Sequence, residues 1–155
     1  MPGESATGHF SNDGIGAFTD QYTFQLVGSS FVAFASATND YVSASDFITN
    51  FTGQLFLQVG AVAGDGNDIP VNAPAAAVGC PGNPGGCQIL AGVALLDAGN
   101  YFLQLSGTGG STAGYGGNLT VQEAIPEPAT WAMILFGFAG IGLMAAHRRQ
   151  RLRLT

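Results

Sequence analysis

Residues 18–26, Phe-Thr-Asp-Gln-Tyr-Thr-Phe-Gln-Leu, alternate apolar and polar side chains with a period of two. Successive side chains of an extended strand point to opposite faces. One face therefore carries Phe18, Tyr22, Phe24 and Leu26. The other face carries Thr19, Gln21, Thr23 and Gln25. The pattern predicts a strand with one face in a core and the other in water.

Short apolar runs recur from residue 14 to residue 122, separated by Gly, Asn, Asp and Pro, which favour turns. We expect further strands at Phe31–Ala37, Phe47–Thr49, Leu55–Val62, Gln88–Leu95, Tyr101–Ser106 and Gly117–Gln122. Residues 97–100, Asp-Ala-Gly-Asn, predict a hairpin turn, and residues 64–67 and 70–87 are typical of loops. The pattern predicts an all-β fold: a small antiparallel β-sandwich with a jelly-roll-like arrangement.

Charge is unevenly distributed along the chain. Charged residues make up only 9% of the sequence, against about 25% in an ordinary soluble domain. All ten acidic residues lie between Glu4 and Glu127, there is no lysine, and the four arginines lie in the last eight positions. Nucleic acid and anionic membrane surfaces are therefore poor partners for residues 1–127.

Residues 129–146 form a stretch of eighteen residues without a charge. In a helix this stretch spans about 27 Å, close to the thickness of a bilayer's hydrocarbon core. A buried core helix is the alternative, but the stretch is apolar on all sides, with Trp131 at one edge and arginines beyond the other. We expect a single C-terminal transmembrane helix. The positive-inside rule places the arginines in the cytoplasm and residues 1–127 on the far side of the membrane.

Pro126, Glu127 and Pro128 precede this span, and residues 147–155 form an Arg-rich end. This order resembles the PEP-CTERM sorting signal of Gram-negative bacteria. The resemblance implies recognition by an exosortase, a membrane cysteine transpeptidase that processes such tails as the protein moves to the cell surface, commonly alongside exopolysaccharide production. Pro126, Glu127 and Pro128 are then the recognition element. The membrane interface and stop are marked by Trp131, Arg148, Arg149 and Arg151. A plain linker into a single-pass anchor is the alternative.

The chain divides into a flexible stretch at 1–13, an exported β-sandwich at 14–122 and a sorting tail at 123–155. The first ten residues, MPGESATGHF, have neither the basic nor the apolar region of a signal peptide. Proteins with this tail normally carry one, so we expect that a leader was trimmed or that the start codon was assigned too late.

Residues 16–24 resemble the opening motif of a PEP-CTERM subgroup called FxDxA. The segment from Ala98 to Leu119 resembles the closing hairpin of that subgroup, although Tyr22 stands where its name expects a small residue. We expect Asp20 to pair with backbone amides rather than to act in catalysis.

Cys80 and Cys87 flank Pro-Gly-Asn-Pro-Gly-Gly, a sequence that turns tightly. A disulfide is expected in an oxidising compartment, while free thiols or a metal remain alternatives. Asp65, Asn67 and Asp68 are weak candidates for Ca²⁺ ligands, but the later glycine and the distal glutamate of a calcium loop are missing. We expect a solvated turn there and no metal or cofactor. The glycines between 109 and 117 are typical of a mobile hairpin.

The residues that could carry catalysis are few. His9 is the only histidine before the tail, and residues 1–147 contain no lysine or arginine to stabilise an oxyanion. We expect no enzyme but a non-catalytic surface or extracellular-matrix protein linked to exopolysaccharide or biofilm. One alternative is a carbohydrate-binding module whose exposed aromatics are Tyr41, Tyr101 and Tyr115. Another is a permanently anchored periplasmic protein.

Overall fold

A computed structural model describes residues 5–13, 15–38, 47–80 and 83–124, together with Met133, Phe136, Phe138 and Ala139; for 83–86 it describes the backbone only. The chain divides into two compact units, residues 1–124 and residues 125–155. The first unit is all-β, as predicted. Its strands are β1 (Ser5–Asn12), β2 (Gly16–Leu26), β3 (Ser30–Thr38), β4 (Ile48–Leu57), β5 (Ile69–Pro70), β6 (Ala75–Ala76), β7 (Val78–Cys80), β8 (Asn83–Leu96), β9 (Gly99–Gly109) and β10 (Tyr115–Glu123).

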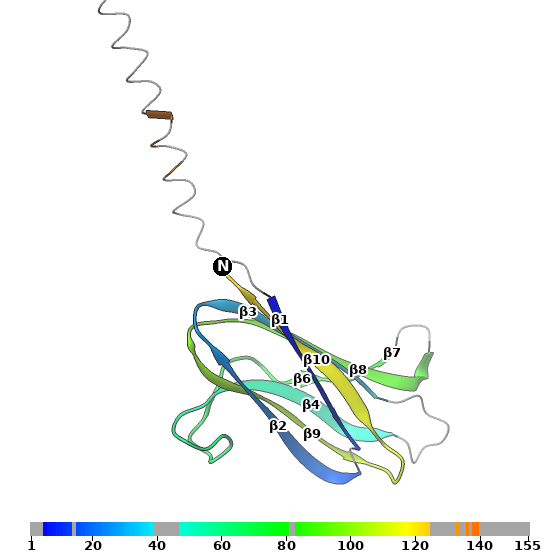
Figure 1. Cartoon of the computed structure of the whole chain (residues 1–155). Coiled ribbons are helices and arrows are strands. Elements are labelled where there is room, and N and C mark those ends of the chain that lie inside the picture. Colours follow the sequence, from blue (N-terminus) through cyan, green and yellow to red (C-terminus); the bar gives the residue numbers. More distant parts are fainter. Residues whose placement is uncertain are drawn as a thin grey trace, which may run out of the picture. The chain divides into compact units, whose positions relative to one another are not determined.

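The strands form two sheets whose paired strands run antiparallel (Figure 1). Sheet A has the order β1-β10-β3-β8-β7, and sheet B has the order β2-β9-β4-β5, with β6 also paired to β4. Strand β1 therefore lies at one edge of sheet A, and β2 lies at one edge of sheet B. The predicted antiparallel arrangement is confirmed.

The strands of eight residues or more alternate between the two sheets along the chain. The prediction that residues 97–100 form a hairpin turn is therefore wrong. Strand β8 belongs to sheet A and β9 to sheet B, so this turn carries the chain from one layer to the other. The predicted closing hairpin before the tail is wrong for the same reason, because β10 pairs with β1 and β3 and not with β9. Turn residues reverse the chain equally well in both cases, so their chemistry does not reveal which sheet the next strand joins.

Strand β2 has the predicted alternation of burial, and β3, predicted only as a strand, alternates in the same way. The two short strands expected at 47–49 and 55–62 are instead one strand, β4, with an irregular register between Thr49 and Thr52. Asn50 adopts a positive φ of 54° at this irregularity, a conformation that asparagine tolerates better than most residues. Residues 58–62 lie outside the strand.

The stretch expected to be flexible, residues 1–13, contains a strand. Strand β1 pairs with β10 along its whole length, from Ser5 opposite Gln122 to Asn12 opposite Tyr115. The sequence of this strand, SATGHFSN, has almost no apolar alternation, and Phe10 is its single buried residue. Pairing with a neighbouring strand, rather than burial, accounts for this element.

The two sheets enclose one hydrophobic core. Phe34 and Leu90 from sheet A meet Leu105 from sheet B at Gly53, where a Cβ atom would lie within 3.0 Å of all three side chains. The core residues that the structure describes all lie between Phe10 and Val121. Because both the core and its supporting strands belong to residues 1–124, this unit carries what it needs to fold without the tail.

Candidate functional site

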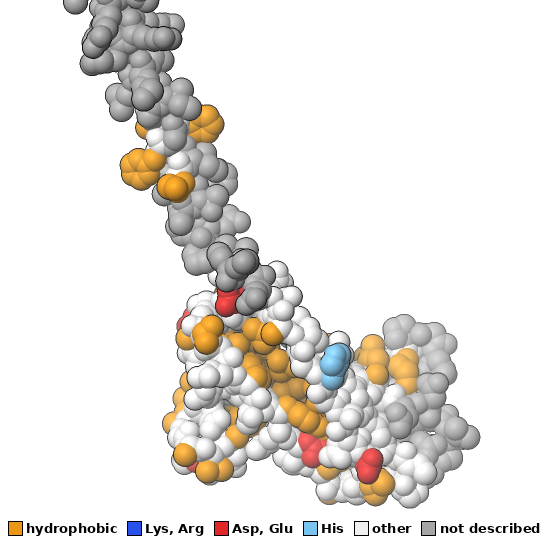
Figure 2. All heavy atoms as spheres, viewed as in Figure 1, with side chains coloured by type: hydrophobic (Ala, Val, Ile, Leu, Met, Phe, Trp, Pro, Cys, Tyr) orange, Lys and Arg blue, Asp and Glu red, His pale blue; other side chains and the backbone are white. Residues whose placement is uncertain are grey.

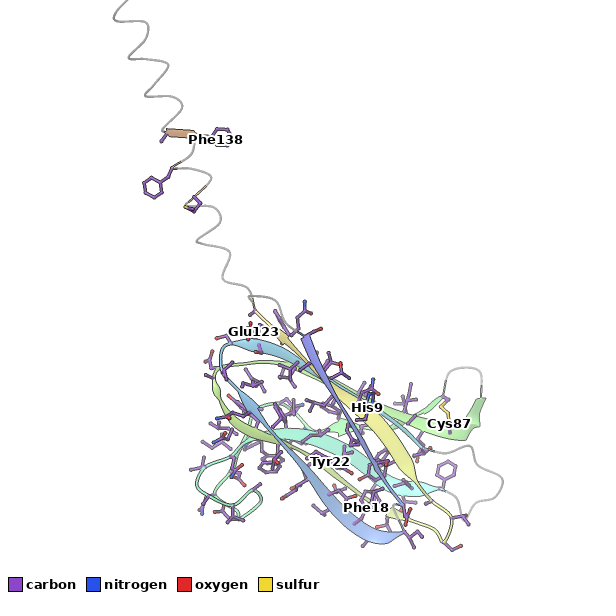
Figure 3. All side chains as sticks on the ribbon, viewed as in Figure 1. His9, Phe18, Tyr22, Cys87, Glu123 and Phe138 are labelled. Carbon is purple, nitrogen blue, oxygen red and sulfur yellow. A yellow bond between two sulfur atoms is a disulfide. The ribbon has the colours of Figure 1, made fainter. Side chains whose placement is uncertain are left out.

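Cys80 and Cys87 form a disulfide, as predicted, with their Cα atoms 5.4 Å apart. Cys80 ends β7, and Cys87 lies in the neighbouring strand β8 (Figure 3). The strand register shifts between Gly79, which pairs with Gln88, and Cys80, which pairs with Asn83. The bond therefore links the edge strand β7 of sheet A to its neighbour β8.

The candidate calcium ligands lie in the loop between β4 and β5, where their carboxylates bind backbone amides. Asp68 accepts hydrogen bonds from the amides of Val59 at 2.8 Å and Gly64 at 2.6 Å. Asp65 accepts one from the amide of Asn67 at 3.0 Å. Within the described ranges, no group of three or more His, Cys, Asp or Glu residues is arranged to hold a metal ion. This geometry is that of a loop closed by its own carboxylates.

A polar cluster lies at the side of the sandwich where β1 and β2 form the sheet edges. Asp20 on β2 accepts a hydrogen bond from the side-chain amide of Asn12 at 2.7 Å and another from the hydroxyl of Tyr115. The hydroxyl of Tyr22 lies 2.9 Å from that of Tyr115. Asp20 thus pairs with two side chains, which corrects the expectation of backbone amides. We call Asn12, Asp20, Tyr22 and Tyr115 the Asp20 cluster.

Aromatic rings surround this cluster. The ring of Tyr115 stacks on Phe18 with centroids 5.4 Å apart and meets Phe51 at 5.3 Å, while Tyr22 meets Phe10 at 4.8 Å. Phe18 and Tyr22 lie along β2 in Figure 3. Figure 2 shows apolar side chains gathered in this view between β1 and β2. The cluster is thus a polar patch set against apolar walls.

The surroundings raise the pKa values of both phenols in the cluster. Burial is the main cause of the raised pKa of Tyr115, and its hydrogen bond to Asp20 adds to it. Burial also raises the pKa of Tyr22, although the hydrogen bond with Tyr115 acts in the opposite direction. Both phenols are therefore protonated at neutral pH and serve as hydrogen-bonding groups.

An open hollow of about 700 Å³ adjoins the cluster and is lined by Ser11, Asn12, Asp13, Ile15, Thr112, Ala113, Gly114 and Tyr115. Sequence reasoning missed this site because its members come from three strands. The available signal was the presence of Asp20 and Tyr22 on the otherwise apolar face of β2. The site offers neutral hydroxyl and amide groups around one carboxylate, an arrangement suited to fixing β1, β2 and β10 together.

The aromatic platform proposed for sugar binding is wrong at two of its three positions. Tyr101 is only 4% exposed and Tyr115 only 3%, so neither ring can stack on a sugar. Tyr101 donates a hydrogen bond to the backbone carbonyl of Asp97 at 3.0 Å, as a partly polar core residue does. Tyr41 lies outside the described residues.

The predicted residues of the sorting tail also lie outside the described residues: Pro126, Glu127, Pro128, Trp131, Arg148, Arg149 and Arg151. Of the predicted span, Met133, Phe136, Phe138 and Ala139 are described; they are helical, and the three large side chains are more than 70% exposed. Among the residues that the structure describes, no helix has the length and apolarity needed to cross a membrane.

Comparison with known families identifies the tail. Residues 124–149 match the PEP-CTERM protein-sorting motif. No curated protein matches the chain. The motif implies an exported protein with a C-terminal sorting signal and an exosortase as its processing partner, as the sequence predicts. Membership of the FxDxA subgroup stays a prediction.

Proposed function

We propose that this chain is a non-catalytic surface or extracellular-matrix protein, tied to exopolysaccharide or biofilm, that an exosortase releases from a transient membrane anchor. The observation that carries the proposal is the match of residues 124–149 to the sorting motif. That segment contains the Pro-Glu-Pro element, the uncharged stretch and the first two arginines. The motif lies almost entirely in the second compact unit, residues 125–155, and follows the β unit in the sequence.

The anchor is proposed to cross the inner membrane once, with its arginines in the cytoplasm. Residues 129–146 carry no charge and have the length of a spanning helix, and arginines follow on one side only. The exposure of Met133, Phe136 and Phe138, at 76%, 77% and 71%, supports a lipid environment for this segment, because water is a poor solvent for such side chains.

The absence of catalysis is also a proposal. In the Asp20 cluster, the carboxylate accepts hydrogen bonds from the Tyr115 phenol and the Asn12 amide, and the Tyr22 phenol bonds to Tyr115. Among the described residues, these hydrogen bonds involve no histidine or lysine that could act as a base. His9 is exposed on β1, opposite Asn118, where it faces no carboxylate partner in its strand pair. Such an arrangement serves stability better than proton transfer.

The sandwich itself favours a structural or binding role. Its strand orders, β1-β10-β3-β8 against β2-β9-β4-β5, support the jelly-roll-like arrangement expected from the sequence. A fold of this kind hosts many functions, so the proposal rests on the tail and not on the architecture.

The proposal is tested by following the tail in cells that contain an exosortase. Glu127→Ala should leave the protein in the membrane fraction, whereas the parent chain should appear at the cell surface or in the medium. Glu123→Ala is the matched control, because it removes a carboxylate just outside the matched residues 124–149. Intact parent protein in the membrane fraction would instead favour the permanently anchored alternative.

A further inference from the structure

The outward faces of β3 and β8 carry apolar side chains where a soluble sheet normally carries polar ones. Three register pairs join them: Phe31 with Leu95, Ala33 with Val93, and Ala35 with Ala91. All six residues are exposed, and Phe31, Val93 and Leu95 are 51%, 67% and 61% exposed. We call these six residues the apolar stripe.

The stripe continues along sheet A. The next register pair is Ala37 with Ile89, and Ile89 pairs with Val78 of β7, which is 60% exposed. The other half of the same face is polar, since Ala33 pairs with Thr120 of β10, which pairs with Thr7 of β1. A contiguous apolar area of this kind marks an interaction surface more often than it marks ordinary surface.

We infer that the apolar stripe is a docking surface for a second copy of this chain, with the two copies packed sheet against sheet.

Charge supports a second copy as the partner. The acidic side chains of the described residues lie off the stripe, and residues 1–147 contain no lysine or arginine. Two such domains repel each other wherever their carboxylates approach. The stripe is an uncharged area on which two copies can meet without placing like charges together.

The sizes of the side chains are self-complementary. The pair at one end of the stripe, Phe31 with Leu95, is large, and the pair at the other end, Ala35 with Ala91, is small. A two-fold axis running across the strands at the middle pair places the large end of one copy over the small end of the other. The same axis separates the acidic residues near the large end, Asp97 after β8 and Glu123 opposite Ser30.

The available area sets the strength of the contact. The whole outer face of sheet A, five strands spaced by about 4.8 Å over a length of about 20 Å, offers roughly 480 Å² on each copy, and the apolar stripe is the smaller part of it. This lies at the small end of specific interfaces, so the association is weak and depends on concentration. Crowding of anchored copies in one membrane would raise their effective concentration.

The test measures the mass of residues 1–124 by sedimentation equilibrium from about 10 µM to about 500 µM, a range suited to a weak interface. The parent unit should rise from the monomer mass toward twice that mass. Val93→Glu places a carboxylate at the centre of the stripe and should remove at least nine-tenths of the association. Thr23→Glu is the matched control: Thr23 is also β-branched and exposed in a strand, but lies on the outer face of sheet B.

A folding failure is kept apart from a lost contact by a second variant. Val93→Thr keeps the shape of the side chain and should weaken association several-fold with an unchanged near-ultraviolet circular dichroism spectrum. The inference is overturned if the parent unit stays monomeric over the whole range, or if Thr23→Glu weakens association as much as Val93→Glu. Val93-dependent binding of a monomeric parent unit to phosphatidylcholine vesicles would also overturn it, by identifying lipid as the partner.

Discussion

The hydroxyl of Tyr115, on β10 of sheet A, donates a hydrogen bond to the carboxylate of Asp20, on β2 of sheet B. The same carboxylate oxygen accepts a bond of 2.7 Å from Asn12 on the edge strand β1. One carboxylate therefore joins three strands from both layers at the side where each sheet has an edge. Since the edges of a sandwich are where its layers separate most easily, this bond contributes to stability at a vulnerable position.

Removing the hydroxyl should destabilise the sandwich. Tyr115→Phe leaves the stacked ring in place but deprives Asp20 of a donor, which typically costs about 1–3 kcal/mol of unfolding free energy. Urea denaturation of residues 1–124 measures this loss. Combining the change with Asp20→Ala tests the partner, because contacting residues give non-additive effects. Fully additive effects of the two changes would mean that the hydrogen bond contributes nothing.

Stability should fall at alkaline pH. Burial raises the pKa of Tyr115 above its ordinary value of 10. The unfolded chain thus releases the phenolic proton near pH 10, while the folded chain retains it. The stabilisation is fully present below about pH 10 and is lost as the pH rises beyond it.

Unfolding free energies measured from about pH 8 to about pH 11 check this, and Tyr115→Phe should show a shallower decline. Because the chain has no lysine, tyrosines dominate the titration in this range. The pKa values of Tyr22 and Tyr101 are also raised by burial, so some decline should persist in the variant. Identical pH profiles for parent and variant would contradict the assignment.

Gly117 should not tolerate a side chain. A Cβ atom there would lie 2.1 Å from the carbonyl oxygen of Ala35 and 2.7 Å from the ring of Phe10. Because the backbone of β3 must move to relieve this contact, Gly117→Ala should cost about 3 kcal/mol or more, at or above the usual range for overpacking. Gly8→Ala on β1 is the control, since a Cβ atom there has no neighbour within 4 Å. Equal melting temperatures for the two variants would refute this packing.

The disulfide should contribute modestly to stability. Cys80 and Cys87 are seven positions apart, and closing so short a loop restricts the unfolded chain by about 2–3 kcal/mol. The double variant Cys80→Ser, Cys87→Ser should lose this amount in urea denaturation. Adding a reductant should lower the stability of the parent chain to that of the double variant and leave the variant itself unchanged.

The sequence was most informative where one strand buries one face. The period of two in β2 predicted its burial pattern, because Leu26 belongs to the core and Phe18, Tyr22 and Phe24 pack against it. The sequence was least informative for β1, because this strand forms through its pairing with β10. The Asp20 cluster escaped prediction because Asp20 and Tyr115 are 95 positions apart and meet only once both sheets have formed.

The tail shows the opposite case. Pro126, Glu127 and Pro128, the uncharged stretch and the arginines lie in one continuous segment, so their function can be recognised without a fold. Residues 124–149 match the sorting motif for this reason. No such local signal shows which sheet β9 joins after β8, because the turn at 97–100 suits both a hairpin within one sheet and a crossing to the other sheet.

The central claim is that the tail directs export and is then removed. Intact-mass and terminal-peptide mass spectrometry of the protein recovered from cells with an active exosortase tests this most directly. We predict a mature chain that retains the β unit of residues 5–124 and lacks residues 129–155. Recovery of the protein solely with Arg148, Arg149 and Arg151 still attached would contradict the claim.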